Sequence, residues 1–344
     1  MKRFISSIII TVSVVAGAFA QTDLQPAAIV RLTRSEPITV RQLRNEVERF
    51  ERQGGRALTA GERRQVLDVM INERLAIQAA ERDRITVTDN ELNGQLQQLR
   101  TIMAQQIGRQ PTDAEFAQAV RSETGLDMPA YREQLRRQIV TQRLLMSTKG
   151  EILNAVRPPT EAEIVQAYTL NSSQFVRPES VRFSIIQIPF EPDRTRARET
   201  ANRLIQEIGT DPVRFDQAVL RANAPNSGYM AGDGGYLPRN QQAMQVVGQA
   251  FMNAAFSLRQ GQVSSLIEGN GGFQIIKITE NHPQALLTLD DIFQLGSTMT
   301  VRDYIGNMMF QERQQQALQR ATQELINELR RGNPFQVFEN NINW

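Results

Sequence analysis

Five short segments of the form Thr-x-x-Glu or Thr-x-x-Gln punctuate the first half of this sequence. In such a capping box the Thr side chain bonds the backbone N–H of the third following residue, whose side chain bonds back to the Thr backbone. Each segment therefore predicts the start of a helix. The five pairs are Thr39 with Gln42, Thr59 with Glu62, Thr88 with Glu91, Thr112 with Glu115 and Thr160 with Glu163. The chain up to about residue 175 is therefore expected to be mostly helical.

Apolar residues recur every third or fourth position after these starts, as on one face of an amphipathic helix. We interpret these rows as core, and Met70 and Met103 as core filling. A short strand at 28–32, ending in a turn at Glu36–Pro37, is expected before the helices. The rows are Leu43, Val47 and Phe50; Leu67, Ile71, Leu75 and Ala79; Leu92, Leu96, Leu99 and Met103; and Tyr131, Leu135 and Ile139.

The first twenty residues have the pattern of a secretory signal peptide. Lys2 and Arg3 precede a long apolar run that closes on an A-x-A site ending at Ala20,. We expect cleavage after Ala20 and no stable membrane insertion of the mature chain. The run also approaches the roughly 20 residues that a spanning helix needs, so a retained N-terminal anchor is the alternative.

Composition excludes several chemistries. The chain has no cysteine, so disulfides and thiol catalysis are impossible,. Its one histidine, His282, cannot by itself form a multi-histidine metal site. His282 lies in a turn-like exit from a predicted strand, so the sequence does not favour a histidine-based hydrolase triad either. Of the 39 basic residues two lie in the signal segment, so the mature chain balances its 37 acidic residues and has no basic surface for nucleic acid,. We expect no metal and no cofactor.

The pattern changes near Val176-Arg177-Pro178. A buried strand at 181–188 is followed by helices at 197–208 and from Asp211-Pro212, whose Asp and Pro fit N-cap and first-turn positions,. A loop over 221–242, a helix at 251–258 and two strands, 263–268 and 273–279, complete the segment. Gly269-Asn270-Gly271-Gly272 predicts a hairpin between the two strands. The order β-α-α-α-β-β describes a small α+β domain.

Helices return after Leu289, and residues 335–338 resemble a terminal strand that can pair near Ile29. The fold class is therefore α+β, a helical frame built from both ends of the chain with one inserted domain. The expected organisation is a signal peptide at 1–20, an N-terminal helical domain at 21–177, the inserted domain at 178–283, and a C-terminal segment at 284–344 that completes the frame.

The inserted domain resembles a parvulin, the small prolyl isomerase fold. Its motifs correspond in spacing to the family patterns G-G-D-L-G-W, F-x-x-A-A-F-x-L and G-Y-H-I-I-K or G-F-H-I-I-K. The matching runs are 231–236, Phe251 to Leu258, and Gly272-Phe273-Gln274-Ile275-Ile276-Lys277. The frame resembles SurA-type periplasmic chaperones through the runs 36–39, 71–75 and 130–136. SurA itself has two parvulin domains in tandem, whereas this chain has one.

The resemblance implies a set of site positions. The family's first-strand His falls on Ser184, its second His on Gln274 and its Cys or Asp on Ala224, so no catalytic residue is assigned. Ser184 and Gln274 are expected to be able to pair with each other. The proline pocket keeps its Phe as Phe251, while its Met falls on Val247, or on Met244 if the loop carries a gap. We expect peptide binding from Phe251, Val247, Met244 and Phe256.

The function implied is that of an exported periplasmic chaperone for unfolded or nascent exported proteins, outer-membrane proteins among them. The parvulin-like domain is expected to be catalytically degenerate, with isomerase activity weak or lost, because every polar family position has changed. The alternative is an active peptidyl-prolyl cis-trans isomerase, or rotamase, of broad X–Pro specificity. A scaffold that binds one dedicated envelope partner is a third hypothesis.

Overall fold

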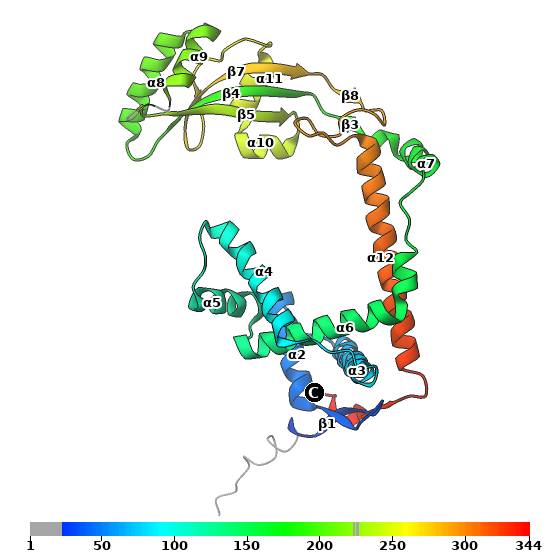
Figure 1. The fold of residues 1–344 in the computed structure, drawn as a ribbon. Coiled ribbons are helices and arrows are strands. Elements are labelled where there is room, and N and C mark those ends of the chain that lie inside the picture. Colours follow the sequence, from blue (N-terminus) through cyan, green and yellow to red (C-terminus); the bar gives the residue numbers. More distant parts are fainter. Residues whose placement is uncertain (1–22, 223, 225–226) are drawn as a thin grey trace, which may run out of the picture. The chain divides into compact units, whose positions relative to one another are not determined.

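A computed structural model of the chain describes residues 23–222, 224 and 227–344 (Figure 1). The predicted signal peptide and its cleavage site lie outside these residues. The chain divides into two compact units. The helical unit runs to Val156 and resumes over Arg313–Trp344, and the sheet unit spans Arg157–Glu312. Both ends of the described chain therefore belong to one unit, which the other interrupts.

Helices make up most of the helical unit. All five predicted capping boxes are confirmed, four in this unit and the fifth at the start of α7 (Glu161–Asn171) in the sheet unit. At Thr59, for example, the backbone N–H donates to the Glu62 carboxylate at 2.8 Å. The helices are α2 (Val40–Gly54), α3 (Ala60–Arg82), α4 (Asp89–Ile107), α5 (Asp113–Thr124), α6 (Met128–Asn154) and, from Arg313 onward, the remainder of α12 (Val301–Leu329).

The two ends of the described chain meet in a small antiparallel sheet. β1 (Pro26–Val30) lies between β2 (Glu36–Thr39) and β9 (Phe335–Val337), and the 3₁₀ turn η2 (Glu339–Asn341) follows. Ile29 pairs with Gln336, which confirms the predicted pairing of the terminal strand. The predicted turn at Glu36–Pro37 is wrong, because these residues open β2. β2 is an edge strand, where a proline can leave one ladder position unpaired.

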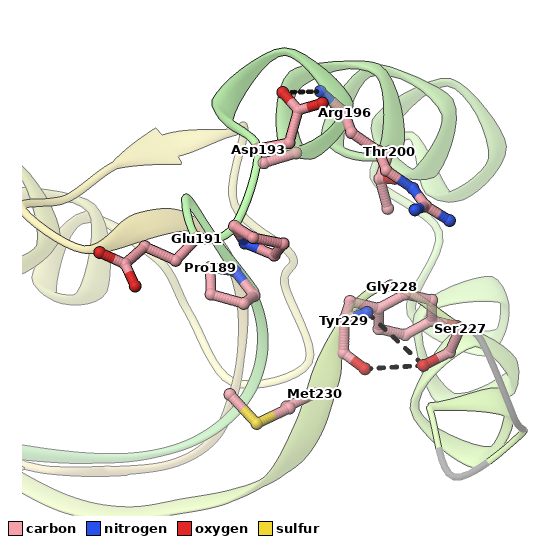
Figure 2. A pocket seen from close by; sticks show the side chains of 11 residues that line it. Pro189, Glu191, Asp193, Arg196, Thr200, Ser227, Gly228, Tyr229 and Met230 are labelled. Atoms are coloured by element: carbon pink, nitrogen blue, oxygen red, sulfur yellow. Dashed lines mark hydrogen bonds between the residues drawn. The ribbon is translucent and has the colours of Figure 1, made fainter.

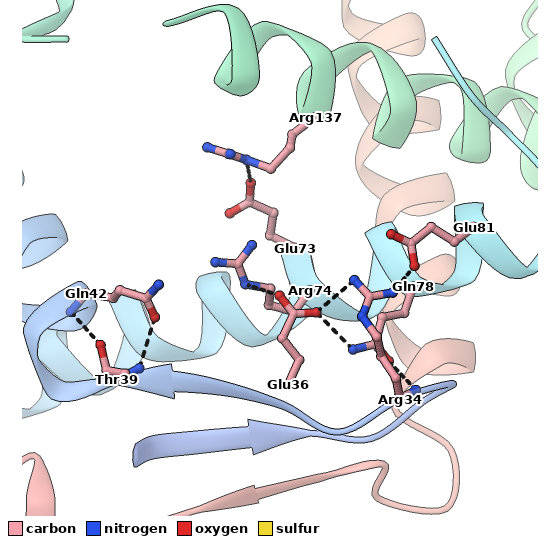
Figure 3. A network of polar contacts seen from close by, with 9 residues as sticks. All are labelled: Arg34, Glu36, Thr39, Gln42, Glu73, Arg74, Gln78, Glu81 and Arg137. Carbon is pink, nitrogen blue, oxygen red and sulfur yellow. Dashed lines mark hydrogen bonds and ion pairs between the residues drawn. The ribbon is translucent and has the colours of Figure 1, made fainter. Parts of the chain in front are cut away.

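A buried glutamine ties this sheet to α3 (Figure 3). The Gln78 side chain is fully buried, and its carbonyl oxygen accepts from the backbone N–H groups of residues 32–34 at 3.0 to 3.4 Å. Its amide nitrogen donates to Glu36 at 3.2 Å, and Glu36 also pairs with Arg74 at 3.2 Å. One buried side chain thus accepts hydrogen bonds from three backbone donors in the β1–β2 connection and fixes its conformation,.

The core of the helical unit is the apolar row predicted on α3, where Leu67, Ile71, Leu75 and Ala79 are fully buried. The apolar rows predicted on α2 and α4 are not buried along their whole length. Phe50, on α2, is 42% exposed, and Leu99, on α4, is 37% exposed. α4 packs with α5 and α6 around a small second cluster only, so its outer turns have no further layer to bury them. That second cluster centres on Leu96, Phe116 and Val120.

A four-stranded antiparallel sheet organises the sheet unit, in the order β5-β4-β7-β6 (Figure 1). One face packs on α8 and α9 through Ile186 and Ile188, and the other packs on α10 and α11 through Phe183 and Ile276. The predicted strands at 181–188 and 273–279 and the glycine hairpin are confirmed. The elements are β4 (Ser180–Pro189), α8 (Arg194–Ile208), α9 (Pro212–Arg221), β5 (Met230–Pro238), α10 (Gln241–Val247), α11 (Gln249–Ser257), β6 (Ile267–Glu268) and β7 (Gly272–His282).

The predicted loop over 221–242 is wrong in its middle, because β5 forms there and pairs with β4 along eight positions from Gln187 to Ser180. Two of its glycines are required, one by packing and one by its backbone conformation. A Cβ at Gly234 would overlap the Phe183 ring, and Gly235 adopts a φ of +74°. The register shifts between Phe183 and Ser184, as at a bulge,. Cross-strand packing therefore outweighs the low strand propensity of a glycine-rich run.

The sheet unit is wider than the predicted segment 178–283. Its additional part is an aromatic cluster in which Phe175 meets Tyr168 at 5.7 Å and Phe293 stacks on Tyr304 at 4.1 Å between ring centroids. The boundaries of the parvulin-like segment itself stay a prediction. The elements around the cluster are α7, the 3₁₀ turn η1 (Ser172–Gln174), β3 (Val176–Arg177), β8 (Ala285–Leu286) and the first turns of α12.

Candidate functional site

The four side chains predicted to bind a peptide gather on the α10–α11 face of the sheet. Phe251 belongs to the buried cluster there, and Met244, Val247 and Phe256 pack against it half-buried. Phe251 is only 3% exposed, and its ring meets that of Phe183 edge-on at 5.3 Å. The Phe251 ring is therefore packed against the protein's own side chains.

Ser184 lies on the opposite face of the sheet from Gln274. In the β4–β7 ladder Ser184 stands opposite Lys277, whose ammonium pairs with Asp216 of α9. Directly paired residues share a face and successive residues alternate, so Ser184 belongs to the α8–α9 side. The expectation that Ser184 and Gln274 can pair is wrong. Both β4 neighbours of Ser184 lie on the α10–α11 side, where Phe183 belongs to the Phe251 cluster and Ile185 packs against it.

Gln274 pairs across the ladder with Gln187, a residue that the sequence reasoning missed. Both lie on the α10–α11 face. The Gln274 carbonyl oxygen is buried and has no hydrogen-bond partner among the described residues. It lies against the hairpin, where a Cβ at Gly269 would approach it to 3.3 Å. Strict alternation along 181–188 would have placed Gln187, but not Ser184, on the side of Ile185.

Ala224 follows α9 and is exposed. Its N–H donates to the Arg221 carbonyl at 3.0 Å, and its own carbonyl accepts from Ser227 at 3.2 Å, so its contacts are local. A methyl side chain offers no proton and no lone pair. The three residues that the sequence reading assigned to the polar positions of the family therefore do not come together: Ser184 lies on the α8–α9 face, Gln274 on the α10–α11 face, and Ala224 is exposed after α9. None of the three side chains is ionisable.

A separate hollow of about 380 Å³ lies at the end of the same sheet (Figure 2). It is bordered by Pro189 at the end of β4, Arg196 and Thr200 on α8, and Tyr229 before β5. Much of its polar border is engaged locally: Asp193 caps α8 by accepting from Thr195 at 2.8 Å, and the Ser227 hydroxyl donates to the Tyr229 carbonyl at 2.9 Å. It was not foreseen from the sequence.

A largely apolar hollow lies in the helical unit, between α3, α6 and the end of α12. We call it the central groove. Its volume is about 570 Å³, and its apolar border includes Val69, 62% exposed, and Leu318, 49% exposed. One charged side chain borders it, Glu73, which accepts from Arg137 at 2.9 Å. The remaining lining is Asn72, Ala76, Gln138, Thr141, Gln142, Leu145, Thr322, Leu325, Ile326 and Leu329.

A second hollow of about 650 Å³ adjoins the central groove, since Val69 and Glu73 border both. It is bordered by Phe50 and by Met70, which packs against the core as predicted and also lines this hollow. In the described part of the chain, no cluster of three or more His, Cys, Asp or Glu residues could hold a metal. None of the described helices has the length and apolarity to span a bilayer.

Two family models match this chain. A SurA-like N-terminal domain matches residues 1–145, and a PPIC-type PPIASE domain matches residues 159–293. Among curated relatives, the foldase protein PrsA of Clostridium botulinum strain Hall is 23% identical over 303 residues, covering 86% of this chain and 79% of the relative. The chaperone SurA of Alkalilimnicola ehrlichii is 26% identical over 291 residues, covering 81% of this chain and 64% of the relative.

Solved structures give the same two names at low similarity. A structure from the study of the SurA-like chaperones PEB4 and Cj1289 of Campylobacter jejuni is 13% identical and covers 91% of this chain and 99% of its own, with a TM-score of 0.39. PrsA from Bacillus subtilis is 18% identical and covers 90% and 93%, with a TM-score of 0.25. The sequence matches define a helical chaperone module joined to a parvulin-type domain. The chain thus matches a SurA-like N-terminal domain followed by a PPIC-type parvulin domain, and the relatives reported above are named foldase protein PrsA and chaperone SurA.

Proposed function

We propose that this protein is an exported periplasmic chaperone that holds unfolded envelope proteins, outer-membrane proteins among them. The central groove is the observation that carries the proposal. It presents exposed apolar side chains between uncharged amides and hydroxyls. An unfolded chain offers apolar side chains and unpaired backbone groups, and such a surface complements both.

Export is proposed from the signal-peptide pattern of residues 1–20, with cleavage after Ala20,. The printed names of the relatives, foldase and chaperone, support a role in the folding of other proteins. The parvulin-like domain is proposed to be catalytically degenerate. Its α10–α11 face carries Ile185, Gln187 and Gln274, none of which titrates near neutral pH, around an aromatic ring that is already buried.

The test measures aggregation of an unfolded outer-membrane protein in the presence of the full mature chain. The double variant Val69→Asn with Leu318→Asn removes exposed apolar surface from the central groove and is expected to lose most of the suppression. The matched control is Val213→Asn with Leu220→Asn, exposed side chains of α9, of which Val213 is 62% exposed like Val69. Equal loss in both doubles, or in neither, would refute the groove as the holding surface.

A second assay follows cis/trans exchange of a short X–Pro peptide, because rotation about that bond is slow without a catalyst. No acceleration is expected. Acceleration that disappears in Phe251→Ala would establish the alternative, an active isomerase. A scaffold would instead show no suppression of aggregation and one stoichiometric partner.

A further inference from the structure

We infer that the central groove continues across α6 into a positively charged hollow, so that the combined site selects extended polypeptide segments whose apolar residues are followed on one side by acidic residues. The inference rests on the proposed function and adds a charge pattern to the client. It concerns only the helical unit, where all the residues involved lie.

The positively charged hollow, which we call the cationic hollow, is distinct from the hollow beside Phe50 and has a volume of about 750 Å³. Four of its residues recur on α6 at the spacing of one helix face: Ile139, Gln142, Arg143 and Met146,. Met146 is 47% exposed. The other border is the connection after α3, formed by Arg84, Ile85 and Thr86, and Ser147 completes the lining.

Gln142 borders both the central groove and the cationic hollow. The α6 residues on the groove side are Gln138, Thr141 and Leu145, one step around the helix from those of the hollow. Gln142 is exposed between the two sets. A chain that crosses α6 at Gln142 therefore reaches both hollows, and the Gln142 amide can donate to one peptide carbonyl and accept from one peptide N–H.

The two hollows differ in charge. The single charged group of the central groove, Glu73, is engaged by Arg137. The cationic hollow is bordered by Arg84 and Arg143 and by no acidic side chain. Arg143 already pairs with Glu91 at 2.6 Å, whereas Arg84 has no ion pair within the described residues. Charge complementarity thus favours a client segment that is uncharged in the groove and acidic in the hollow.

The backbone of Arg84 supplies a clean test. Its φ of +58° lies in the left-handed region, which glycine adopts with less strain than arginine does,. The side chain is exposed, so packing does not require it. Arg84→Gly is therefore expected to remove the charge without lowering the melting temperature. Arg84→Lys keeps the positive charge and also keeps the strain of a non-glycine residue at this left-handed backbone position.

The experiment compares three labelled peptides that share one uncharged apolar core and carry two acidic, two serine or two lysine residues at one end, with the ends also exchanged. Binding to the full mature chain is followed by fluorescence anisotropy at low and high salt. The acidic peptide is expected to bind about twofold to fivefold more tightly than the serine peptide, the range of exposed ion pairs. The preference should fade in high salt.

Arg84→Gly should abolish the preference while binding of the serine peptide stays unchanged, and Arg84→Lys should retain it. Because the chain has no cysteine, Ser147→Cys can also capture a thiol placed at the acidic end of the peptide. Ser257→Cys is a matched control, since both serines are exposed and donate to the carbonyl three residues earlier.

Equal binding of acidic and lysine peptides to the wild type overturns the inference, as does a preference that survives in Arg84→Gly. Failure of all peptides to bind overturns it as well. If aggregation of the unfolded protein is still suppressed in that case, the proposed chaperone function stands without this charge pattern. If suppression is also absent, both fail.

Discussion

The candidate surfaces of the two units differ in how far their apolar side chains are exposed to solvent. In the central groove Val69 is 62% and Leu318 49% exposed, whereas on the parvulin-like face Phe251 is 3% exposed and Ile276 fully buried. A surface that binds varied polypeptide segments needs apolar side chains that are exposed to solvent. Side chains that are already packed within the protein are not available to contact a client. Function resides in such sites and not in the fold. Of the two surfaces compared, the central groove is the one whose apolar side chains are open to solvent.

The largest expected effect is on the α10–α11 face of the sheet, where Phe251 is buried. Phe251→Ala should lower the free energy of unfolding of the sheet unit by about 3–5 kcal/mol, because a buried aromatic ring leaves a cavity. Holding of unfolded proteins by the helical unit should persist below the transition. Hydrogen exchange of β4 and β7 measures the loss. Val246→Ala, at a side chain that is 81% exposed, is the control and should change little,. Loss of holding without loss of stability would reverse the comparison.

The next largest effect is on the stability of the helical unit, which carries the central groove. Gln78→Leu leaves the N–H groups of residues 32–34 without their acceptor and should lower the stability of the helical unit by about 3 kcal/mol,. Urea unfolding can be followed through the chain's one tryptophan, Trp344, which contacts Arg44 of α2. Gln97→Leu, on the exposed side of α4, serves as the control. An equal effect of the two substitutions would refute the role given to Gln78.

A smaller effect asks whether the α10–α11 face of the sheet can be made catalytic. Ile185→His with Gln274→His places two imidazoles on one side of the sheet, whereas Ser184→His with Gln274→His places them on opposite sides. The first pair should accelerate X–Pro exchange about tenfold over the parent, equivalent to about 1.4 kcal/mol of barrier. The second pair should not. Equal rates for the two pairs would contradict the assignment of faces.

The smallest effect is the acid response of the helix starts in the helical unit. Hydrogen bonds from Arg56 and from Thr59 lower the pKa of Glu62 to about 2, and hydrogen bonds from Arg143 and from Thr88 do the same for Glu91. A carboxyl whose folded pKa is depressed contributes stability that is present above its unfolded value of 4.5 and is lost as pH falls toward about 2,.

The urea midpoint read from Trp344 should therefore decline between about pH 4.5 and about pH 2. Glu91→Gln should flatten part of that decline, and the change should be small because the carboxylates are exposed,. An identical pH profile in the variant would show that this cap contributes nothing to the acid response.

The sequence predicted the features that depend on neighbours along the chain. Capping boxes are local chemistry, so Thr39, Thr59 and the other starts were recognisable without tertiary knowledge. The buried strand at 181–188 and the glycine hairpin followed from apolar patterning and turn chemistry. The pairing of the terminal strand with Ile29 followed from the arrangement of the helical segments around an inserted domain.

The features that were missed depend on distant contacts. β5 forms because Gly234 accommodates the Phe183 ring, which no local propensity reveals. The face of Ser184 depends on the register of β4 against β7. Val69 and Leu318 are as apolar as core residues, and they differ from them only in their exposure to solvent. A sequence shows that a side chain is apolar, and only the assembled helices show whether it is open to solvent.

The sheet between the first and last strands has a consequence for how the molecule comes into existence. The Asn341 amide donates to the Pro26 carbonyl across 315 positions of sequence, and the central groove needs side chains from 318 to 329. A chain made or exported from its N-terminus can complete the contiguous sheet unit first. The central groove exists only once these final residues have emerged, so a growing or partly exported chain lacks this surface until its end is complete.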